Sequence, residues 1–179
     1  MGEQIESLGN STVVQLNGVL SSQTDGVGPV ELVRDIAAKS SGRSRVFYAP
    51  FVTPTVASAR DLRRDPTIHW AMAAFSRLDI AVVSVGLWAA GASGLYDSLT
   101  AKECEELAQA GAIAEVCGIV VDRDGGQVTS PATERVLGIS YEELRRVPEV
   151  IAVVHTGIDR APAIRALAGR TGSMAVPIG

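Results

Sequence analysis

The chain has 179 residues, of which 46% are hydrophobic and 20% are charged, and its formal net charge is −4. This length and composition are typical of one globular domain with a proper core, and they exclude a disordered chain. The negative charge offers no basic face for nucleic acid, and no apolar run reaches the roughly 18 residues that a membrane helix needs. The acidic, polar start Met1–Gln4 is unlike a signal peptide, so a cytoplasmic protein without a membrane partner is expected.

Cysteine usage and motif content argue against a cofactor or a catalytic centre. Cys104 and Cys117 are too few for a disulfide framework and lack metal-type spacing, so we expect two buried or idle thiols in a reducing compartment. The sequence contains no phosphate loop of the GxxxxGK[ST] type, no GxGxxG fingerprint and no GxSxG elbow. We therefore predict no cofactor, no metal site and no catalytic residue.

The first half of the chain predicts short strands separated by helices. Apolar periodicity, proline positions and Gly-containing loops set the boundaries. In chain order, we expect a strand at 12–17, a helix from 29 to about 40, a strand at 45–50, a helix from 54 to 62 and a helix from 66 that leads into the next strand.

The stretch Leu78–Gly86 is a continuous apolar run of strand length. A run without polar/apolar alternation is typical of a strand buried on both faces, so it is predicted as the centre of the sheet. Ligands of open α/β sheets bind at the carboxyl ends of the strands. The small-residue segment Gly86–Asp97 is therefore predicted as a pocket wall and flexible cover, in which Trp88 either stacks on a ligand or packs in the interior.

The second half continues the alternation of helices and strands. Thr100 with Glu103, and Ser140 with Glu143, have the spacing of capping boxes at helix starts. In chain order, we expect a helix at 101–110, a strand at 112–122, a turn at 123–126 with a hairpin arm at 127–129, a short helix to 146, a strand at 150–154, a helix at 158–168 and a strand at 174–178. This alternation predicts an α/β fold with a mostly parallel sheet flanked by helices, in a single domain 1–179.

Polar groups follow several predicted strands at their carboxyl ends, which a parallel sheet brings to one edge. Amides, hydroxyls and one guanidinium suit a polyol that carries an anionic group. The alternative is that these are turn residues that any parallel sheet needs. The residues concerned are Gln15, Asn17, Gly18, Pro50, Gly86, His155 and Arg160.

Glu115 and the two histidines leave alternatives open. Glu115 lies in the apolar segment Ile113–Gly118, where a buried carboxylate needs partners. It either binds sugar hydroxyls or lies at the sheet edge in solvent. His155 either contacts a ligand or has a hydrogen-bonded structural role, whereas His69 is expected on a helix in a surface or packing role.

Six segments in order resemble the sugar-binding (effector) domain of SorC/DeoR-type bacterial transcriptional regulators. Each segment is weak alone, but the ordered set is specific and spans roughly residues 12–170. The resemblance implies a three-layer, mostly parallel sheet similar to the phosphosugar-isomerase/CoA-transferase-like fold. It also implies a phosphorylated sugar as ligand and homo-oligomers, dimeric or tetrameric. The segments are 13–18, 48–50, 78–86, 111–118, 137–139 and 157–164.

The resemblance also assigns roles by position. Asn17 and Gly18 would line the sugar pocket, and Glu115 takes the place of the family's sugar-contacting acid, more commonly Asp. Arg160 takes the place of the usual lysine near the phosphate, and it keeps the charge but cannot form a Schiff base. The predicted ligand-binding set is Gln15, Asn17, Gly18, Pro50, Gly86, Glu115 and Arg160.

The family's remaining parts are expected to be absent from this chain. The resemblance implies a separate N-terminal helix-turn-helix domain that binds DNA. It also implies a first part of the effector domain, with one strand and a Gly/Ser/Thr-rich helix start that usually receives the phosphate. Without that part, incomplete phosphate binding and a sheet edge that another chain covers are expected.

Three functions compete on this basis. The predicted one is a non-catalytic sensor. Ligand binding would shift the populations of an oligomer, and the DNA-binding domain would convert that shift into a change in operator affinity. The second is a sugar-phosphate isomerase-like enzyme of the same fold, with Glu115 or His155 as its general base. The third is an interaction-only domain that has lost its ligand.

Overall fold

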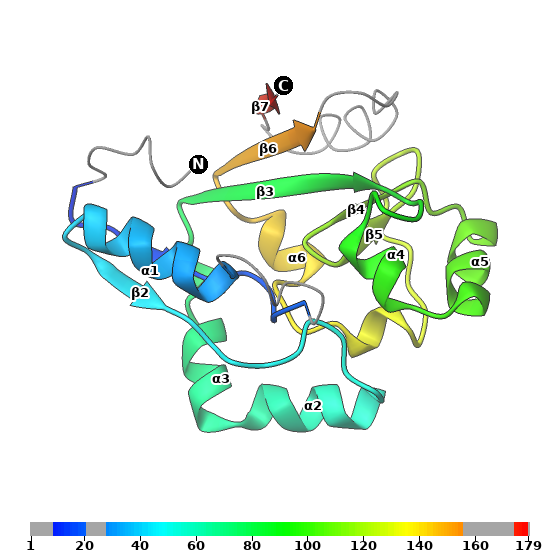
Figure 1. Ribbon diagram of the computed structural model, residues 1–179, viewed down its shortest axis with the longest axis horizontal. Coiled ribbons are helices and arrows are strands. Elements are labelled where there is room, and N and C mark those ends of the chain that lie inside the picture. The colour runs from blue at the N-terminus through cyan, green and yellow to red at the C-terminus, as the bar shows by residue number, and fades with distance from the viewer. Residues whose placement is uncertain (1–8, 21–27, 156–173, 179) are drawn as a thin grey trace.

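The computed structural model describes residues 9–20, 28–155 and 174–178. Its helices and strands form a mixed α/β fold (Figure 1). The strands are β1 (Thr12–Val14), β2 (Arg43–Arg45), β3 (Ile80–Leu87), β4 (Ala114–Val116), β5 (Ile119–Val121), β6 (Glu149–His155) and β7 (Met174–Ile178). The helices are α1 (Pro29–Lys39), α2 (Val56–Arg64), α3 (Pro66–Met72), α4 (Gly94–Ser98), α5 (Ala101–Gln109) and α6 (Tyr141–Leu144), with 3-10 turns η2 (Phe75–Arg77) and η3 (Thr133–Arg135).

The described strands form a five-stranded sheet in the order β5-β4-β3-β6-β7 and a two-stranded sheet of β1 and β2. β3, β6 and β7 run parallel, and so do β1 and β2. β4 pairs antiparallel with both β3 and β5. The predicted parallel arrangement therefore holds for β3, β6 and β7, and it is wrong on the β4 side of the sheet.

β3 alternates between buried and exposed side chains. Ala81 and Val83 face the core, whereas Ile80 and Val82 are 53% and 50% exposed. The prediction of a strand buried on both faces is therefore wrong for the described part of the fold. An apolar run shows that a strand can be buried on both sides, but the neighbouring elements decide which faces are covered.

The apolar stretch 112–122, predicted as one strand, is a β-hairpin. Val116 pairs with Ile119, which leaves Cys117 and Gly118 as a two-residue turn. Both turn residues have positive φ, 52° and 79°. Two-residue hairpins favour such turns because their twist matches that of the strands. The prediction of a single strand is wrong because a cysteine at the first turn position carries no turn signal.

The chain beyond β1 and β2 continues extended, although the predicted strands at 12–17 and 45–50 are both shorter as observed. The Val19 N–H donates to the Ala49 carbonyl, and the Phe51 N–H donates to the Val19 carbonyl. The segments that follow the two strands therefore lie side by side.

Helix starts follow the predicted caps. Thr100 and Ser140 each accept a hydrogen bond from the backbone N–H three residues later, and Glu103 and Glu143 complete the capping boxes. Asp65 caps α3 in front of a proline. These side chains satisfy N–H groups that have no partner within the helix, so local sequence sets where the helices begin.

Glu103 also connects α5 to η3. Its Oε2 accepts hydrogen bonds from the Thr100 backbone and hydroxyl, and its Oε1 pairs with Nη2 of Arg135 at 2.7 Å. The Thr100 backbone hydrogen bond, helped by the Thr100 hydroxyl and the Arg135 charge, holds the pKa of Glu103 below its usual range.

We predict that Glu103→Gln reduces the loss of stability in acid. Because the pKa of Glu103 is lower in the folded chain, its carboxylate stabilises the fold above the unfolded pKa of about 4.3. This contribution disappears as the pH falls through the folded value. Urea unfolding at about pH 7 and about pH 3 should show a smaller pH-dependent loss for the variant than for the wild type. Glu105→Gln, on the exposed face of the same helix, should keep the wild-type loss, and equal losses in all three proteins would contradict the prediction.

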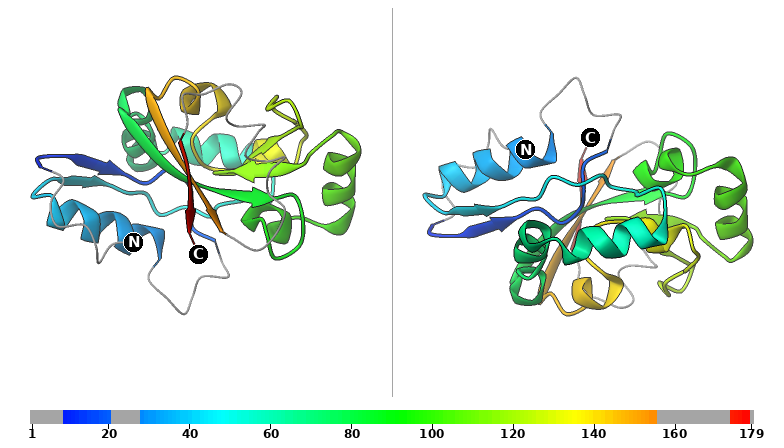
Figure 2. Two further views of the ribbon diagram at one scale, coloured as in Figure 1. Left: turned by 90° about the horizontal axis from the view of Figure 1, so that it is seen from above. Right: turned by 90° about the horizontal axis from the view of Figure 1, so that it is seen from below.

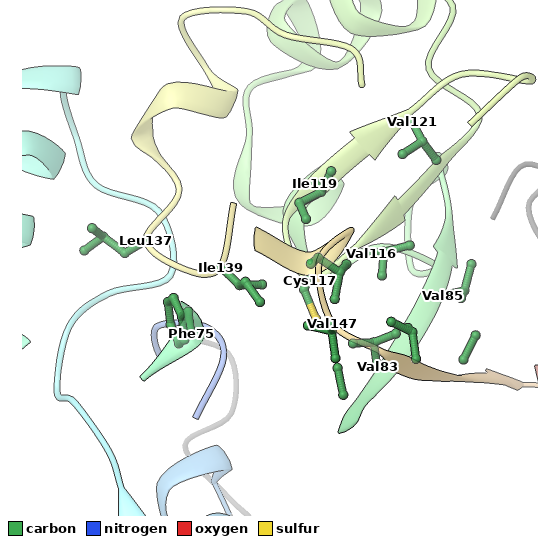
Figure 3. Packing of buried hydrophobic residues seen from close by; sticks show 14 of the residues in the cluster. Phe75, Val83, Val85, Val116, Cys117, Ile119, Val121, Leu137, Ile139 and Val147 are labelled. Carbon is green, nitrogen blue, oxygen red and sulfur yellow. The ribbon is translucent and has the colours of Figure 1, made fainter. Parts of the chain in front are cut away.

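Two clusters of buried apolar side chains hold these elements together. The larger one joins β3, β4, β5 and β6 to α2, α3, α6 and η2, and Figure 3 shows Val83, Val85 and Val116 within it. The smaller one consists of Phe51, Leu95, Leu107, Val120, Val128 and Val136, and it connects α4 and α5 to the hairpin. In the described residues, α2, α3 and α6 lie on one side of β3 and β6, and α1 lies along β1 and β2 (Figures 1 and 2).

Candidate functional site

Gln15 is buried, and both ends of its amide are engaged. Its Oε1 accepts from the Phe47 N–H at 3.1 Å, and its Nε2 donates to the Asn17 carbonyl at 2.6 Å. The side chain thus ties the segment after β1 to the segment after β2. These two hydrogen bonds and its burial give Gln15 a structural role, and a direct contact between Gln15 and a ligand stays a prediction.

Asn17, Gly18 and Pro50 lie together. A Cβ on Gly18 would be 2.5 Å from the Pro50 carbonyl oxygen, so only glycine allows this close approach of the two segments. Asn17 forms an antiparallel bridge with Gly138. The Asn17 side-chain amide is half-buried and has no hydrogen-bond partner among the described residues. It is therefore available to a ligand hydroxyl.

Gly86 and Glu115 face each other in the β3-β4 pair. Glu115 is only 8% exposed, so the alternative in which it lies at the sheet edge in solvent does not hold. Its Oε2 accepts from the Ser93 hydroxyl at 2.8 Å, and its Oε1 accepts from the Gly118 N–H at 2.6 Å. The carboxylate thus connects the hairpin turn to the segment that follows β3.

Sequence reasoning missed Ser93 as part of this arrangement. Ser93 is buried and caps α4 by accepting from the Tyr96 N–H at 3.0 Å, while its own hydroxyl donates to Glu115. A serine in front of a helix start could have predicted the cap. Nothing in the sequence indicated the contact with Glu115, which depends on the hairpin folding back beside β3.

Both cysteines are buried free thiols, as predicted. Burial, followed by the Glu115 charge, raises the pKa of Cys117 to about 12, so its thiol is protonated at neutral pH. The Cys104 thiol donates to the Tyr96 carbonyl, and burial raises its pKa as well. Protonated thiols are poor nucleophiles, which agrees with a structural role for both.

The two groups of residues are neighbours in space. The Leu20 side chain lies 3.0 Å from the position of a Cβ on Gly94, and the Phe51 ring lies 3.0 Å from the corresponding position on Gly118. Residues next to the two groups are therefore in contact, while a shared binding site for Asn17, Gly18, Pro50, Gly86 and Glu115 stays a prediction. Arg160 lies outside the described residues, and so does the side chain of His155 at the end of β6.

The segment Gly86–Asp97 is closely held where it leaves β3. It includes all of α4 except Ser98, and the Gly91 N–H donates to Oδ1 of Asp97 at 2.9 Å. The Trp88 indole N–H donates to the Cys104 carbonyl, and its ring meets Tyr96 edge-on with centroids 5.2 Å apart. These contacts favour packing for Trp88 over stacking on a ligand, and the role of the segment as a cover stays a prediction.

A cavity of about 450 Å³ is bordered by Gly118 and Gly138 and also lined by Arg63, His69 and Glu143. Burial lowers the pKa of Arg63, partly opposed by Glu143, and Arg63 donates to the Val136 carbonyl. His69 is exposed, as expected of a surface residue. In the described part of the chain, no cluster of His, Cys, Asp or Glu has the arrangement of a metal site. No described helix is long and apolar enough to cross a membrane.

Mixed α/β folds often bind small molecules at the carboxyl ends of their strands. The family model Sugar-bind, which describes a sugar-binding domain, matches residues 2–172. The chain belongs to this family, the sugar-binding domains of SorC/DeoR-type transcriptional regulators.

Known relatives are transcriptional regulators rather than enzymes. The chain is 31% identical over 153 residues to the uncharacterized transcriptional regulator YjhU of Escherichia coli K12, a match that covers 82% of this chain and 44% of YjhU. The chain thus spans less than half the length of this relative. The isomerase alternative is not favoured by these findings.

Solved structures share the fold. The full-length sorbitol operon regulator SorC from Klebsiella pneumoniae matches with a TM-score of 0.85 at 20% identity, covering 98% of this chain and 59% of that one. A DeoR family transcriptional regulator from Listeria monocytogenes matches with a TM-score of 0.79 at 21% identity, covering 93% of this chain and 65% of that one.

Proposed function

We propose that residues 1–179 form the effector-sensing domain of a cytoplasmic transcriptional regulator and that this domain binds a phosphorylated sugar. The observation that carries the proposal is the match of residues 2–172 to a sugar-binding family. The close approach of Gly18 to Pro50 and the pairing of Gly86 with Glu115 support it.

The chemistry of these residues suits a polyol. The Asn17 amide can both donate to and accept from sugar hydroxyls, and each Glu115 oxygen retains a further lone pair beyond the bonds to Ser93 and Gly118. A carboxylate that is already oriented by two hydrogen bonds accepts a hydroxyl with little further ordering. Arg160, assigned from its position in the sequence, supplies the charge for the phosphate.

The regulatory consequences belong to the same proposal. A DNA-binding helix-turn-helix domain outside these residues would convert ligand binding into a change in operator affinity, through a homo-oligomer that this domain helps to form. The family resemblance supports this regulatory mechanism. It also supports a complete fold of the phosphosugar-isomerase/CoA-transferase-like type, with helices on both faces of the sheet. No cofactor is needed for such a switch.

We predict that Arg160→Ala weakens phosphorylated sugars much more than the same sugars without phosphate. Loss of a charge-assisted contact of about 2–3 kcal/mol corresponds to a 30- to 150-fold loss of affinity. Isothermal titration with matched pairs, such as fructose 6-phosphate and fructose, measures the difference. Asn17→Ala is the control, because it should weaken both members of a pair to the same extent. If Arg160→Ala weakens the binding of both sugars equally, Arg160 does not bind the phosphate.

The proposed function is tested by thermal shift against a panel of sugar phosphates, run beside an isomerase assay on the same panel. Stabilisation by one or a few compounds without turnover is the expected result. Turnover of any compound would show that the domain is an enzyme and would contradict the proposed sensor function. The absence of a shift with every compound would favour an interaction-only domain.

A further inference from the structure

The cavity bordered by Gly118 and Gly138 has no part in the proposed sugar site. Its volume of about 450 Å³ falls within the range of roughly 300–1,000 Å³ that small-molecule pockets have. Residues of α2, α3, η2, the hairpin turn and α6 line it. None of the described residues predicted to bind the sugar lines this cavity, so it is a separate feature.

One part of the lining is apolar and firmly held. Phe75, Ile119 and Ile139 are only 3–5% exposed and belong to the main core, in which Figure 3 shows them. The Tyr141 hydroxyl donates to the Gly125 carbonyl at 2.8 Å, which fixes the ring of this residue. Aromatic and methionine side chains make favourable contacts with aromatic rings, so this lining suits an apolar group. The apolar lining consists of Met72, Phe75, Ile119, Val136, Ile139 and Tyr141.

Arg63 brings a positive charge to the same cavity. Its guanidinium donates to the Val136 carbonyl, and no carboxylate of the described residues lies within 4.0 Å of it. Burial lowers the pKa of Arg63, which shows that its charge is partly removed from water. A guanidinium has five N–H donors, and it binds a carboxylate through two parallel hydrogen bonds. Arg63 is therefore available to a ligand carboxylate.

Glu143 brings the opposite charge. Its Oε2 accepts from the Ser140 N–H and hydroxyl at 2.9 and 2.6 Å, which leaves Oε1 without a hydrogen bond from the described residues. Glu143 raises the pKa of Arg63, so the two charges attract each other, yet they form no ion pair within 4.0 Å. Glu103 and Arg135, by contrast, meet at 2.7 Å. The fold thus leaves a space between two opposite charges that line one cavity.

We propose that this cavity binds a free α-amino acid with an apolar side chain. Its carboxylate binds Arg63, its ammonium binds Oε1 of Glu143, and its side chain packs on the apolar lining. An α-amino acid carries both charges on one carbon atom. With a charge-assisted hydrogen bond of about 2.8 Å at each end, it bridges two groups that lie near each other without touching.

The two charges exclude ligands that carry only one. A carboxylic acid or a hydroxy acid would balance Arg63 and leave the Glu143 charge facing the ligand without a cation. An amine would balance Glu143 and leave Arg63 without an anion. The zwitterion alone satisfies both groups.

The position of the cavity connects it to the residues predicted to bind the sugar. The Gly118 N–H donates to Glu115, and Gly138 forms a bridge with Asn17. A bound amino acid would therefore lie against the backbone that holds both of these side chains, and its binding would change the affinity for the sugar. This consequence rests on the proposed function, whereas the binding of the amino acid does not.

The test is titration of the 179-residue chain with L-phenylalanine, without any sugar, followed by NMR. Saturable binding with a Kd on the order of 1 mM or below is expected, with shifts at the amides of Gly118, Gly138 and Ile139. 3-Phenylpropionate lacks the ammonium and 2-phenylethylamine lacks the carboxylate, so each should bind about tenfold more weakly. Equal binding of all three compounds would overturn the proposal, because it would show that the charges are not used. Shifts confined to Gly18 and Gly86 would overturn it as well, because they would place the ligand in the sugar site.

Two variants assign the charges one at a time. Glu143→Gln keeps the capping box, which accepts either residue, and it should weaken L-phenylalanine about tenfold without weakening 3-phenylpropionate. Arg63→Gln should weaken L-phenylalanine to a similar extent without weakening 2-phenylethylamine. Glu142→Gln and Arg64→Gln, at exposed neighbouring positions, should bind as the wild type does. Equal weakening of all three compounds by either variant would overturn the assigned role of that residue.

The outcome for the site is separate from the outcome for the sugar. No saturation by L-phenylalanine, L-leucine or L-methionine up to about 10 mM would overturn the amino-acid site, whatever the sugar phosphates do. A sugar phosphate that stabilises the chain should change its Kd by at least about fivefold when L-phenylalanine is saturating. An unchanged Kd would overturn the coupling between the two sites and leave the amino-acid site in place.

Discussion

Glu115→Ala is expected to destabilise the chain by roughly 2–4 kcal/mol, because it leaves two buried donors without an acceptor. The Gly118 N–H and the Ser93 hydroxyl both bond to this carboxylate, at 2.6 and 2.8 Å. Each orphaned donor costs about 1–3 kcal/mol, and release of a buried charge offsets part of the sum. The total free energy of unfolding of a domain is about 5–15 kcal/mol, so this loss of stability is large. Urea unfolding monitored by circular dichroism measures it.

Glu115→Gln separates the structural role of this residue from ligand binding. The glutamine carbonyl can accept from the Gly118 N–H, and its amide can donate to the Ser93 oxygen, so a cost of only about 1 kcal/mol is expected. Affinity for a sugar phosphate should nevertheless fall by about tenfold, since the hydroxyl contact loses its charge assistance. Unchanged affinity in a stable Glu115→Gln protein would show that Glu115 only shapes the site.

Gly86→Ala is expected to reduce sugar-phosphate affinity by at least about tenfold and to destabilise the chain by about 1–3 kcal/mol. A Cβ on Gly86 would lie 2.3 Å from the Ala92 carbonyl oxygen and 3.2 Å from the Ser93 Cα. Both neighbours are backbone atoms, so the segment after β3 must move. That movement pulls Ser93 away from Glu115 and disturbs the site without altering a polar group.

Gly28→Ala is the matched control for this steric effect. A Cβ on Gly28 would meet only the carboxylate end of the flexible Glu31 side chain, at 2.6 Å. The expected change in stability is below about 1 kcal/mol, and ligand affinity should not change. Titration calorimetry and thermal unfolding of both variants make the comparison, and normal binding by Gly86→Ala would place the ligand away from this strand end.

Local signals in the sequence predicted what depends on neighbouring residues alone. The helix starts at Thr100, Ser140 and Asp65 follow from side chains that cap the N–H groups within three residues. The ordered family segments predicted the sugar-binding domain, which the family match over residues 2–172 confirms. The expectation that the strand ends carrying Asn17, Pro50 and Gly86 meet at one edge stays a prediction, because the described β1 and β2 form a sheet separate from that of β3.

Only the tertiary structure decided the features that rest on contacts between distant segments. The hairpin turn at Cys117 and Gly118 makes Glu115 an internal acceptor, and its partner Ser93 lies 22 residues away in sequence. The exposure of Ile80 and Val82 follows from what packs against β3 rather than from their own apolar character. Composition and periodicity thus determined the elements and the family of this protein. Its polar network and its exposed strand face depend on which segments fold side by side, because hydrogen-bond partners and covered faces are properties of the assembled chain.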